Sequence, residues 1–536
     1  GLIAEKAMVV SARVEASKIG SDILQKGGNA YDAMAATQLA LAVVYPVAGN
    51  IGGGGFMVYR SNDGKTGALD FREKAPLTAS RDMYLDEEGN IIPDKSSFGV
   101  HSVGVPGTIA GIFKVYNKFG SLPFKDLIQP SIDMARNGFS VTKKQADSFN
   151  KTRKRFEKAN NYKILFDKKW KEGDWLQQEE LAQTLERIRD HGQDGFYKGK
   201  TAQLFVDYVN ELGGNISLED LIKYKAIWRK PIEFSYKNHK IISMTLPTSG
   251  GICLAQILKS IAPYDLSKIE HNSIKYVQLL TEAERRSYAD RTNFLGDIDF
   301  VNVPLDSLTS TNYIKQRMST FSWDKATPSS EVSHGKVLGY ESDETTHYSI
   351  VDQFGNAVSV TTTLNTDYGS KVLVKGAGFF LNNEMDDFSA KPGVPNVYGL
   401  LGSEANAIAP EKRMLSSMTP TIVEYNGKLK MVIGTPGGST IITSVLQNIL
   451  NVVDYKMGIQ ESVNQPRFHH QWLPDVIRME PNGFDKKTKT KLDSLGYKIF
   501  EENSLIIGKV DAILVLPNGT LEGGADKRGD DAAIGF

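Results

Sequence analysis

Two threonines on a predicted β-hairpin could place a nucleophile beside a hydroxyl partner. The hairpin begins at Thr345 and turns at Gly355, a residue that accepts the left-handed conformation of a three-residue loop. Asp352 and Asn356 then form the first cross-strand pair, and counting outward from them sets Thr345 opposite Thr363. The alternative is a threonine pair on a solvated strand face, because threonine is common in strands.

A glycine turn further along the chain could bind the negative charge of an acyl-transfer intermediate. The predicted strand Lys428 to Gly434 is followed by Gly437 and Gly438, and then by a helix predicted over 441–455. Backbone N–H groups in such a turn, at the positive end of a helix, have the geometry of an oxyanion hole. A tight turn without chemistry explains the same residues equally well.

Charged and hydroxyl residues elsewhere could bind the head of an α-amino acid. Such a head carries a carboxylate and an ammonium, so it requires an arginine with hydroxyl donors on one side and carboxylates on the other. The residues of these types that stand out are Arg72, Glu384, Asp387, Ser416 and Ser417. Taken singly, residues of these types are most often solvated surface.

The secondary structure predicted around these residues indicates sheets covered by helices. A buried helix is expected over 30–44 and amphipathic surface helices over about 143–230. A segment without periodicity, about 319–344, predicts a long linker. After it, Asn-Gly turns at 426–427 and 518–519 predict hairpins. Helices dominate before the linker and strands after it, which favours a layered α+β fold.

The overall composition does not indicate a function, so the function must be inferred from a local site. The 536 residues, 40% of them hydrophobic, allow a large core and by length alone suggest two or three domains. Lys plus Arg and Asp plus Glu both total 63, so the net charge gives no sign of a nucleic-acid partner. Cys253 is the only cysteine and is expected in the core. The longest uncharged run, 33–59, contains Pro46 and several glycines, so no membrane span is expected.

Motifs of other enzyme classes are absent from the sequence. It contains no GxSxG, HExxH or GxxxxGK[ST] pattern, which removes the main support for serine hydrolases, zincins and P-loop enzymes. The glycines 52–55 lack dinucleotide-site spacing and precede a predicted strand. His469 and His470 are adjacent, so their side chains diverge, and a structural role is favoured over a metal site. Neither a metal nor a cofactor is expected.

Together these residues resemble the gamma-glutamyltransferase (gamma-glutamyltranspeptidase) family, and most closely its exported bacterial members. The motifs that carry the resemblance, in the family's order, are Gly49–Phe56, Asp70–Glu73, Thr345–Ser349, Leu381–Asn383, Pro395–Gly399, Leu415–Met418, Gly434–Ser439 and Pro466–His470. They extend over almost the whole chain. The resemblance implies a four-layer αββα sandwich of the N-terminal-nucleophile hydrolase type, in which two chain segments surround one core.

The resemblance also implies roles for single residues. A precursor would cut itself between Glu344 and Thr345 into a large subunit, residues 1–344, and a catalytic small subunit, residues 345–536, which remain together as a heterodimer. Thr345 resembles the nucleophile and Thr363 its hydroxyl partner. The other resembling positions are Gly437 and Gly438 as oxyanion-hole donors; Arg72, Ser416 and Ser417 as carboxylate ligands; Asn365, Glu384 and Asp387 as ammonium ligands; and Tyr398, within 395–400, as part of a lid over the glutamyl pocket.

The implied activity is transfer of a gamma-glutamyl group from a donor such as glutathione to water, an amino acid or a dipeptide. The freed α-amine of Thr345 would serve as the base, because its ordinary pKa of about 7.7–8.0 leaves part of it neutral near physiological pH. The alternatives are a related threonine amidase acting on acyl-antibiotics or poly-gamma-glutamate, and an inactive amino-acid-binding protein. Because the chain begins at Gly1 without methionine, we expect a removed leader and export to the bacterial periplasm.

Overall fold

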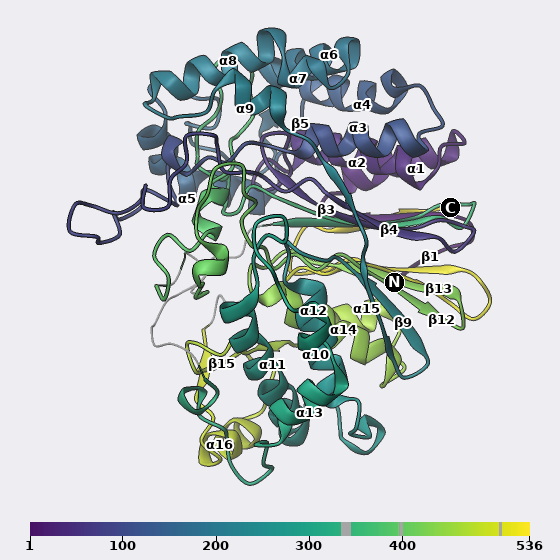
Figure 1. Ribbon diagram of the computed structural model, residues 1–536. Coiled ribbons are helices and arrows are strands. Elements are labelled where there is room, and N and C mark those ends of the chain that lie inside the picture. The colour runs from purple at the N-terminus through teal and green to yellow at the C-terminus, as the bar shows by residue number, and fades with distance from the viewer. Residues whose placement is uncertain (334–344, 395, 397–399, 503–505) are drawn as a thin grey trace.

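The described part of the chain forms two seven-stranded antiparallel sheets that lie face to face between two layers of helices (Figure 1). The computed structural model describes residues 1–333, 345–394, 396, 400–502 and 506–536. The strand order is β19-β2-β10-β11-β3-β4-β7 in the sheet drawn uppermost, here the upper sheet, and β1-β18-β17-β13-β12-β9-β8 in the lower sheet. This arrangement confirms the predicted αββα sandwich.

Both sheets combine strands from distant parts of the chain. The upper sheet consists of β2 (Met8–Ser11), β3 (Gly54–Arg60), β4 (Thr66–Asp70), β7 (Ile227–Arg229), β10 (Thr346–Val351), β11 (Ala357–Thr363) and β19 (Ala532–Gly535). The lower sheet consists of β1 (Leu2–Ala4), β8 (Ile232–Tyr236), β9 (His239–Ser243), β12 (Thr421–Tyr425), β13 (Lys428–Gly434), β17 (Asp511–Val515) and β18 (Leu521–Gly524). Smaller sheets join β14 (Phe468–His469), β15 (Ile477–Met479) and β16 (Ile499–Glu501), and β5 (Phe139–Ser140) with β6 (Trp175–Leu176).

The helices divide between the two outer faces (Figure 1). Those on the side of the upper sheet are α1 (Val14–Gln25), α2 (Ala30–Val44), α3 (Thr108–Phe119), α4 (Phe124–Asn137), α5 (Lys143–Ala159), α6 (Glu179–His191), α7 (Asp194–Tyr197), α8 (Gly199–Glu211) and α9 (Leu218–Lys223). Those on the side of the lower sheet are α10 (Gly250–Ile261), α11 (Ile274–Phe294), α12 (Leu305–Leu308), α13 (Thr311–Met318), α14 (Thr440–Val453), α15 (Ile459–Asn464) and α16 (Lys486–Ser494). The surface helices expected over 143–230 are therefore confirmed as α5 to α9.

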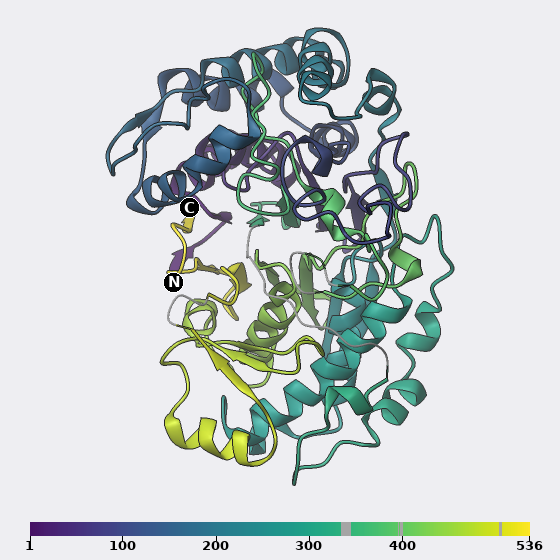
Figure 2. The ribbon, with the colours of Figure 1, turned by 90° about the vertical axis from the view of Figure 1, so that its left-hand side faces the viewer.

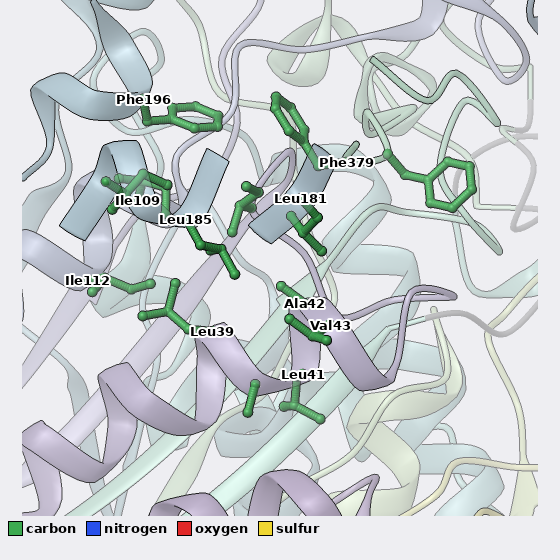
Figure 3. Close-up of a cluster of buried hydrophobic side chains, with 14 of the residues drawn as sticks. Leu39, Leu41, Ala42, Val43, Ile109, Ile112, Leu181, Leu185, Phe196 and Phe379 are labelled. Carbon is green, nitrogen blue, oxygen red and sulfur yellow. The ribbon is translucent and has the colours of Figure 1, made fainter. Parts of the chain in front are cut away.

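Apolar side chains fill the space between the layers. Phe56 and Val58 of β3 face the lower sheet and pack in one cluster with Ile422 of β12. Met57, which lies between them in sequence, belongs instead to the cluster under the helices, because successive strand residues point to opposite faces. Figure 3 shows this second cluster, in which Leu39 of α2 lies near side chains of α3 and α6.

Helix α2 has the predicted bounds and is buried along its whole length. Asn29 and Asp32 form a capping box at its start. The carboxylate of Asp352, in the turn between β10 and β11, accepts a further hydrogen bond from the N–H of Ala30 at 2.8 Å. The first turn of α2 is thus tied to the hairpin that begins after Thr345.

The strands on either side of the predicted linker are interleaved. In the upper sheet β10 and β11 lie between β2 and β3, and in the lower sheet β12 and β13 lie between β17 and β9. Residues 319–333 of the linker contain the short 3-10 turn Ser329–Glu331, and residues 334–344 lie outside the described residues. The chain ends meet at one edge of the molecule (Figure 2), where the N–H of Lys6 donates to the carbonyl of Phe536 at 2.7 Å.

Other expectations from the sequence hold in the fold. The hairpins predicted at 426–427 and 518–519 are the antiparallel pairs β12–β13 and β17–β18. Cys253 is fully buried on α10. Among the described residues, no helix combines the length and the apolar character needed to cross a lipid bilayer.

Candidate active site

Thr345 and Thr363 lie opposite each other at the open end of the β10–β11 hairpin. Thr346 pairs with Thr362, which is the predicted register, and Gly355 has a φ of 91° in the turn. The two Oγ1 atoms of Thr345 and Thr363 are 3.5 Å apart, the outer limit for a hydrogen bond. Both side chains are buried. The predicted meeting of the two hydroxyls is therefore confirmed, and the explanation as a solvated strand face is wrong.

The glycine turn connects β13 to α14. Gly437 and Gly438 have φ values of 136° and 53°, in the range that favours glycine. Helix α14 begins at Thr440 and ends at Val453, close to the predicted 441–455. Within the part of the chain that the structure describes, the N–H groups of these two glycines donate to no protein acceptor. Two amides at the positive end of a long helix are thus available to an anion.

Arg72 forms direct ion pairs with the two acidic residues that were expected on the other side of an amino-acid head. Its Nη1 lies 2.6 Å from a carboxylate oxygen of Glu384, and its Nη2 lies 2.5 Å from one of Asp387. Arg72 follows β4, whereas both acids lie in the 3-10 turn Glu384–Asp387. The arginine and the acids, expected around the two ends of one amino-acid head, are therefore in direct contact in the structure.

Burial changes the protonation of this cluster. Burial lowers the pKa of Arg72, but the neighbouring carboxylates outweigh it and hold that pKa above its usual value. Burial raises the pKa of Glu384 well above the usual range and also raises that of Asp387. Glu73, whose carboxylate is 3.7 Å from Arg72, has its pKa raised by burial to about 8. Three buried carboxyl groups share one arginine in this cluster. At least one of these carboxyl groups therefore keeps its proton at neutral pH.

The remaining predicted ligands surround this cluster. The backbone N–H of Asn365 donates to Oγ1 of Thr363 at 2.7 Å, and its side-chain amide donates to the carbonyl of Asn383 at 3.0 Å. Ser416 lies beside Ser417, whose Oγ accepts a hydrogen bond from Nη2 of Arg291 at 3.1 Å. Asn365 is therefore fixed between the threonine pair and the 3-10 turn that carries the acids.

Arg291 is a site residue that the sequence did not reveal. It lies near the end of α11, and its Nε donates to Oγ of Ser249 at 2.9 Å. Arg291 is 4% exposed. The helix carries charged residues on every side, and all of its residues from Tyr276 to Arg291 are buried. The only available signal was this mixture of charge and apolar residues along one helix, which resembles a solvated helix when considered alone.

These residues line one cavity of about 310 Å³. The predicted site residues on its wall are Arg72, Thr345, Thr363, Asn365, Glu384, Asp387, Ser416, Ser417 and Gly438. Arg291 and several apolar side chains complete the wall, and Gly437, the other predicted glycine, is not part of it. A buried hydroxyl, an arginine, paired carboxyls and a glycine turn thus face one small space, as an amide-cleaving enzyme with a charged substrate would require.

Two predicted positions lie outside the described residues. Glu344, on the far side of the expected cleavage point, is one, and Tyr398 of the expected lid is the other. Asn396, from the same predicted lid segment, is described, and its side-chain amide donates to a carboxylate oxygen of Asp387 at 3.3 Å. The described portion of that segment therefore lies over the charge cluster.

The two adjacent histidines are buried and hydrogen-bonded. His469 contacts the hydroxyls of Ser439 and Thr443, and His470 lies 3.2 Å from a carboxylate oxygen of Asp475. Burial lowers the pKa of His469 to about 3 and that of His470 to about 4, so both rings are neutral at physiological pH. These contacts fit the structural role near Pro466 and Trp472 that the sequence favoured, and the N–H of Trp472 also donates to Nδ1 of His470 at 3.1 Å.

Comparison with known proteins identifies relatives over the whole chain. The family model described as gamma-glutamyltranspeptidase matches residues 16–536. A glutathione hydrolase proenzyme of Escherichia coli is 46% identical over 99% of this chain and 92% of its own length. The crystal structure of Helicobacter pylori gamma-glutamyltranspeptidase is 43% identical over 60% of this chain and 93% of that chain, with a TM-score of 0.59. A cephalosporin acylase from Bacillus halodurans shares the fold over 100% of this chain and 96% of that chain, with a TM-score of 0.88 at 23% identity.

Proposed function

The chain belongs to the gamma-glutamyltranspeptidase family, and on that premise we propose that Thr345 attacks gamma-glutamyl amides and passes the acyl group to water or an amine. One observation carries this proposal. The Thr345 hydroxyl meets Thr363 in a cavity that also contains Gly438 and the Arg72 charge cluster. Nucleophile, oxyanion donor and substrate anchor therefore lie around one space.

Self-cleavage before Thr345 creates the catalytic base. In the precursor, Oγ1 of Thr345 attacks the carbonyl carbon of residue 344, the C–N bond breaks as the nitrogen takes up a proton, and an ester forms. Water then cleaves the ester, which leaves a carboxylate on residue 344 and a free α-amine on Thr345. The interleaved strands support our proposal that the resulting pieces, 1–344 and 345–536, remain together.

In the catalytic cycle, the α-amine of Thr345 accepts the proton of its own hydroxyl as Oγ1 attacks the gamma-carbonyl carbon. The negative charge that develops on the carbonyl oxygen is stabilised by the N–H groups of Gly437 and Gly438. The leaving amine takes up the proton as the amide C–N bond breaks, and an ester remains on the threonine. Water or an acceptor amine then breaks that ester and returns a proton to the threonine oxygen.

Recognition of the glutamyl head uses charges that are already paired. Its carboxylate binds Arg72 with Ser416 and Ser417, and its ammonium binds Glu384 and Asp387 with Asn365. Because Arg72 contacts both acids at 2.5 and 2.6 Å, the zwitterion joins an existing network and its two charges match those of the site. This charge pattern supports an amino-acid head over the acyl group of an antibiotic.

The proposed physiological donor is glutathione, since the Escherichia coli relative is a glutathione hydrolase proenzyme. Amino acids or dipeptides serve as acceptors in place of water. Export to the bacterial periplasm is part of the same proposal, supported by the resemblance to exported bacterial members.

Product analysis with glutathione, with and without glycylglycine, tests the function. The expected products are glutamate and cysteinylglycine in the first case, and gamma-glutamyl-glycylglycine and cysteinylglycine in the second. Sequencing of the small fragment is expected to read Thr-Thr-His-Tyr from its N-terminus. A protein that remains one full-length band and releases no glutamate would support the inactive binding protein, and cleavage of a cephalosporin side chain in preference to glutathione would support an acylase.

A further inference from the structure

Helix α11 contacts the proposed site at two points about one turn apart. The hydroxyl of Tyr288 donates to the carbonyl of Ser439, which is the N-cap of α14 directly after the glycine turn. Nη2 of Arg291 donates to Oγ of Ser417 at 3.1 Å. Residues three positions apart lie on the same face of a helix. One face of α11 therefore supports both the glycine turn and the hydroxyl pair.

The guanidinium of Arg291 joins two segments of the chain. Its Nε donates to Oγ of Ser249 at 2.9 Å, while its Nη2 donates to Ser417. Ser249 is itself fixed to the hydroxyl pair, because its N–H and its Oγ both donate to the carbonyl of Ser416 at 2.8 Å. Since a guanidinium is planar and rigid, its two hydrogen bonds set the position of the Ser417 side chain relative to this frame.

The direction of the hydrogen bond to Ser417 determines what its hydroxyl can do. A guanidinium carries donors and no acceptor, so Oγ of Ser417 accepts from Arg291 and keeps its own hydrogen for another group. The described residues offer that hydrogen no protein acceptor. Ser417 lines the cavity that contains Thr345. A hydroxyl that accepts from a cation is also a stronger donor, and an anion in the cavity receives the benefit.

The charges on the cavity wall indicate why a second arginine is needed. Arg72 is already in ion pairs with Glu384 and Asp387 at 2.6 and 2.5 Å. Among the described residues that line the cavity, the positively charged side chains are Arg72 and Arg291. Arg291 is buried and also acts electrostatically on Asp387. A carboxylate that enters beside the acids is therefore favoured by the charge of Arg291.

We propose that Arg291 is a positioning residue for the α-carboxylate of the donor, because its guanidinium orients and polarises the Ser417 hydroxyl so that its hydrogen bonds that carboxylate. The inference rests on the proposed function of Thr345 and adds a specificity determinant to it. Arg291 takes no part in bond making or breaking. Its effect is selectivity for an acyl group that carries a charged carboxylate next to the ammonium.

A double-mutant cycle tests whether Arg291 acts through Ser417. The value of kcat/KM for gamma-glutamyl-p-nitroanilide is measured for the wild type, Arg291→Met, Ser417→Ala and the double variant. Arg291→Met is expected to lower kcat/KM about 10- to 100-fold, as for the loss of a hydrogen bond to a charged group. In the Ser417→Ala background the same change lowers it less than about 3-fold, because the hydroxyl on which Arg291 acts is already absent.

A second donor tests whether the carboxylate is the group that is recognised. In this donor the α-carboxylate of gamma-glutamyl-p-nitroanilide is replaced by a neutral carboxamide. Arg291→Met is expected to lower kcat/KM for the carboxamide less than about 3-fold, because that group carries no charge for the polarised hydroxyl to bind. Self-cleavage before Thr345 involves no α-carboxylate of a donor, so the small fragment forms in Arg291→Met as in the wild type.

Arg317→Met is the matched control. Arg317 lies on α13, is half-buried and pairs with Asp290 of α11 at 3.1 Å, but it does not line the cavity. Its replacement is expected to lower the thermal unfolding temperature slightly and to leave kcat/KM for both donors within about 2-fold of the wild type. If Arg291→Met does not fold, Arg291→Lys in the two Ser417 backgrounds provides the same cycle with a smaller loss.

The outcomes separate this inference from the function on which it rests. If the wild type releases no p-nitroaniline, the proposed function is overturned and the inference falls with it. If the wild type is active but the Arg291 variant loses the same factor in both Ser417 backgrounds, or for both donors, the inference is overturned and the proposed function stands. A loss confined to the charged donor and to the background with an intact Ser417 supports the inference.

Discussion

Two cavities of the molecule that share no lining residue differ in almost every physical respect. The first, of about 310 Å³, is walled by buried charges that already pair with each other, as Arg72 does with Glu384. The second, of about 810 Å³, is walled by aromatic rings and by lysines on exposed or half-exposed positions. The first is therefore built around buried charge pairs, whereas the charged side chains of the second are exposed or half-exposed.

This contrast predicts a different tolerance for a poorly fitting ligand in each cavity. A buried charged site excludes any group that leaves its charges unpaired, since such a group loses several kcal/mol. An aromatic wall with solvated cations imposes a much smaller penalty for a poor fit. A poor fit is therefore expected to cost more free energy in the first cavity than in the second.

The largest effect is expected at Thr345, on the wall of the first cavity. Thr345→Ala removes the proposed nucleophile, so the chain remains uncut and turnover falls by about 10⁴-fold or more. Gel electrophoresis and glutamate release measure the two results. Thr345→Ser keeps a hydroxyl and is expected to retain both cleavage and activity. A Thr345→Ala protein that is cleaved and active would overturn the assignment.

The next largest effect is expected within the first cavity. Arg72→Lys replaces a planar guanidinium that contacts two acids with a single ammonium, so kcat/KM for the donor falls by about 10²- to 10³-fold, or roughly 3–4 kcal/mol. The KM for the acceptor glycylglycine keeps its wild-type value. Arg81→Lys, at an arginine that is 51% exposed and paired with Glu404, is the control. Equal losses for donor and acceptor would remove the contrast between the cavities.

The pH dependence of stability tests how strongly burial affects the charged groups around Arg72. Burial raises the pKa of Glu73 from 4.5 to about 8, so the folded state binds more protons than the unfolded state in this window and wild-type stability falls as pH rises through it. Glu73→Gln is neutral throughout and gains roughly 1–3 kcal/mol relative to the wild type between pH 5 and pH 8.5. Denaturant unfolding at several pH values measures the difference. A constant difference would show that Glu73 is ionised in the fold.

The smallest effect is expected at the second cavity. Tyr368→Phe removes the hydroxyl that contacts Oγ of Ser148 at 2.7 Å and keeps the aromatic surface. One hydrogen bond from a buried tyrosine to a half-buried serine contributes about 1 kcal/mol, so the acceptor KM changes less than about 5-fold. Donor kinetics in the absence of acceptor provide the comparison. A loss as large as that of Arg72→Lys would show that the second cavity is as demanding as the first.

Local patterns allowed the catalytic strands to be predicted from the sequence. The turn at Gly355 sets the register by geometry over a few residues, and it brought Thr345 opposite Thr363 as counted. Helix α2 was predicted with its observed bounds because its apolar residues and its Asn29 cap are also local signals.

The contacts that escaped prediction depend on residues far apart in the chain. Arg72 and Asp387 are 315 positions apart, and no spacing rule places one beside the other. Arg291 lies on a helix whose charged residues resemble a solvated surface until the other elements cover them. The second cavity takes its wall from four distant parts of the chain, so it exists only in the folded molecule.

The two chain ends meet beside β2 and β19. This arrangement makes it possible to study the proposed catalysis separately from the proposed self-cleavage. A short linker from Phe536 to Gly1, with the chain opened before Thr345, gives a circular permutant whose natural order of strands is preserved in space. Once its initiating methionine is removed, such a protein displays the threonine amine from the moment it folds. Enzyme and precursor then become two sequences that can be studied side by side.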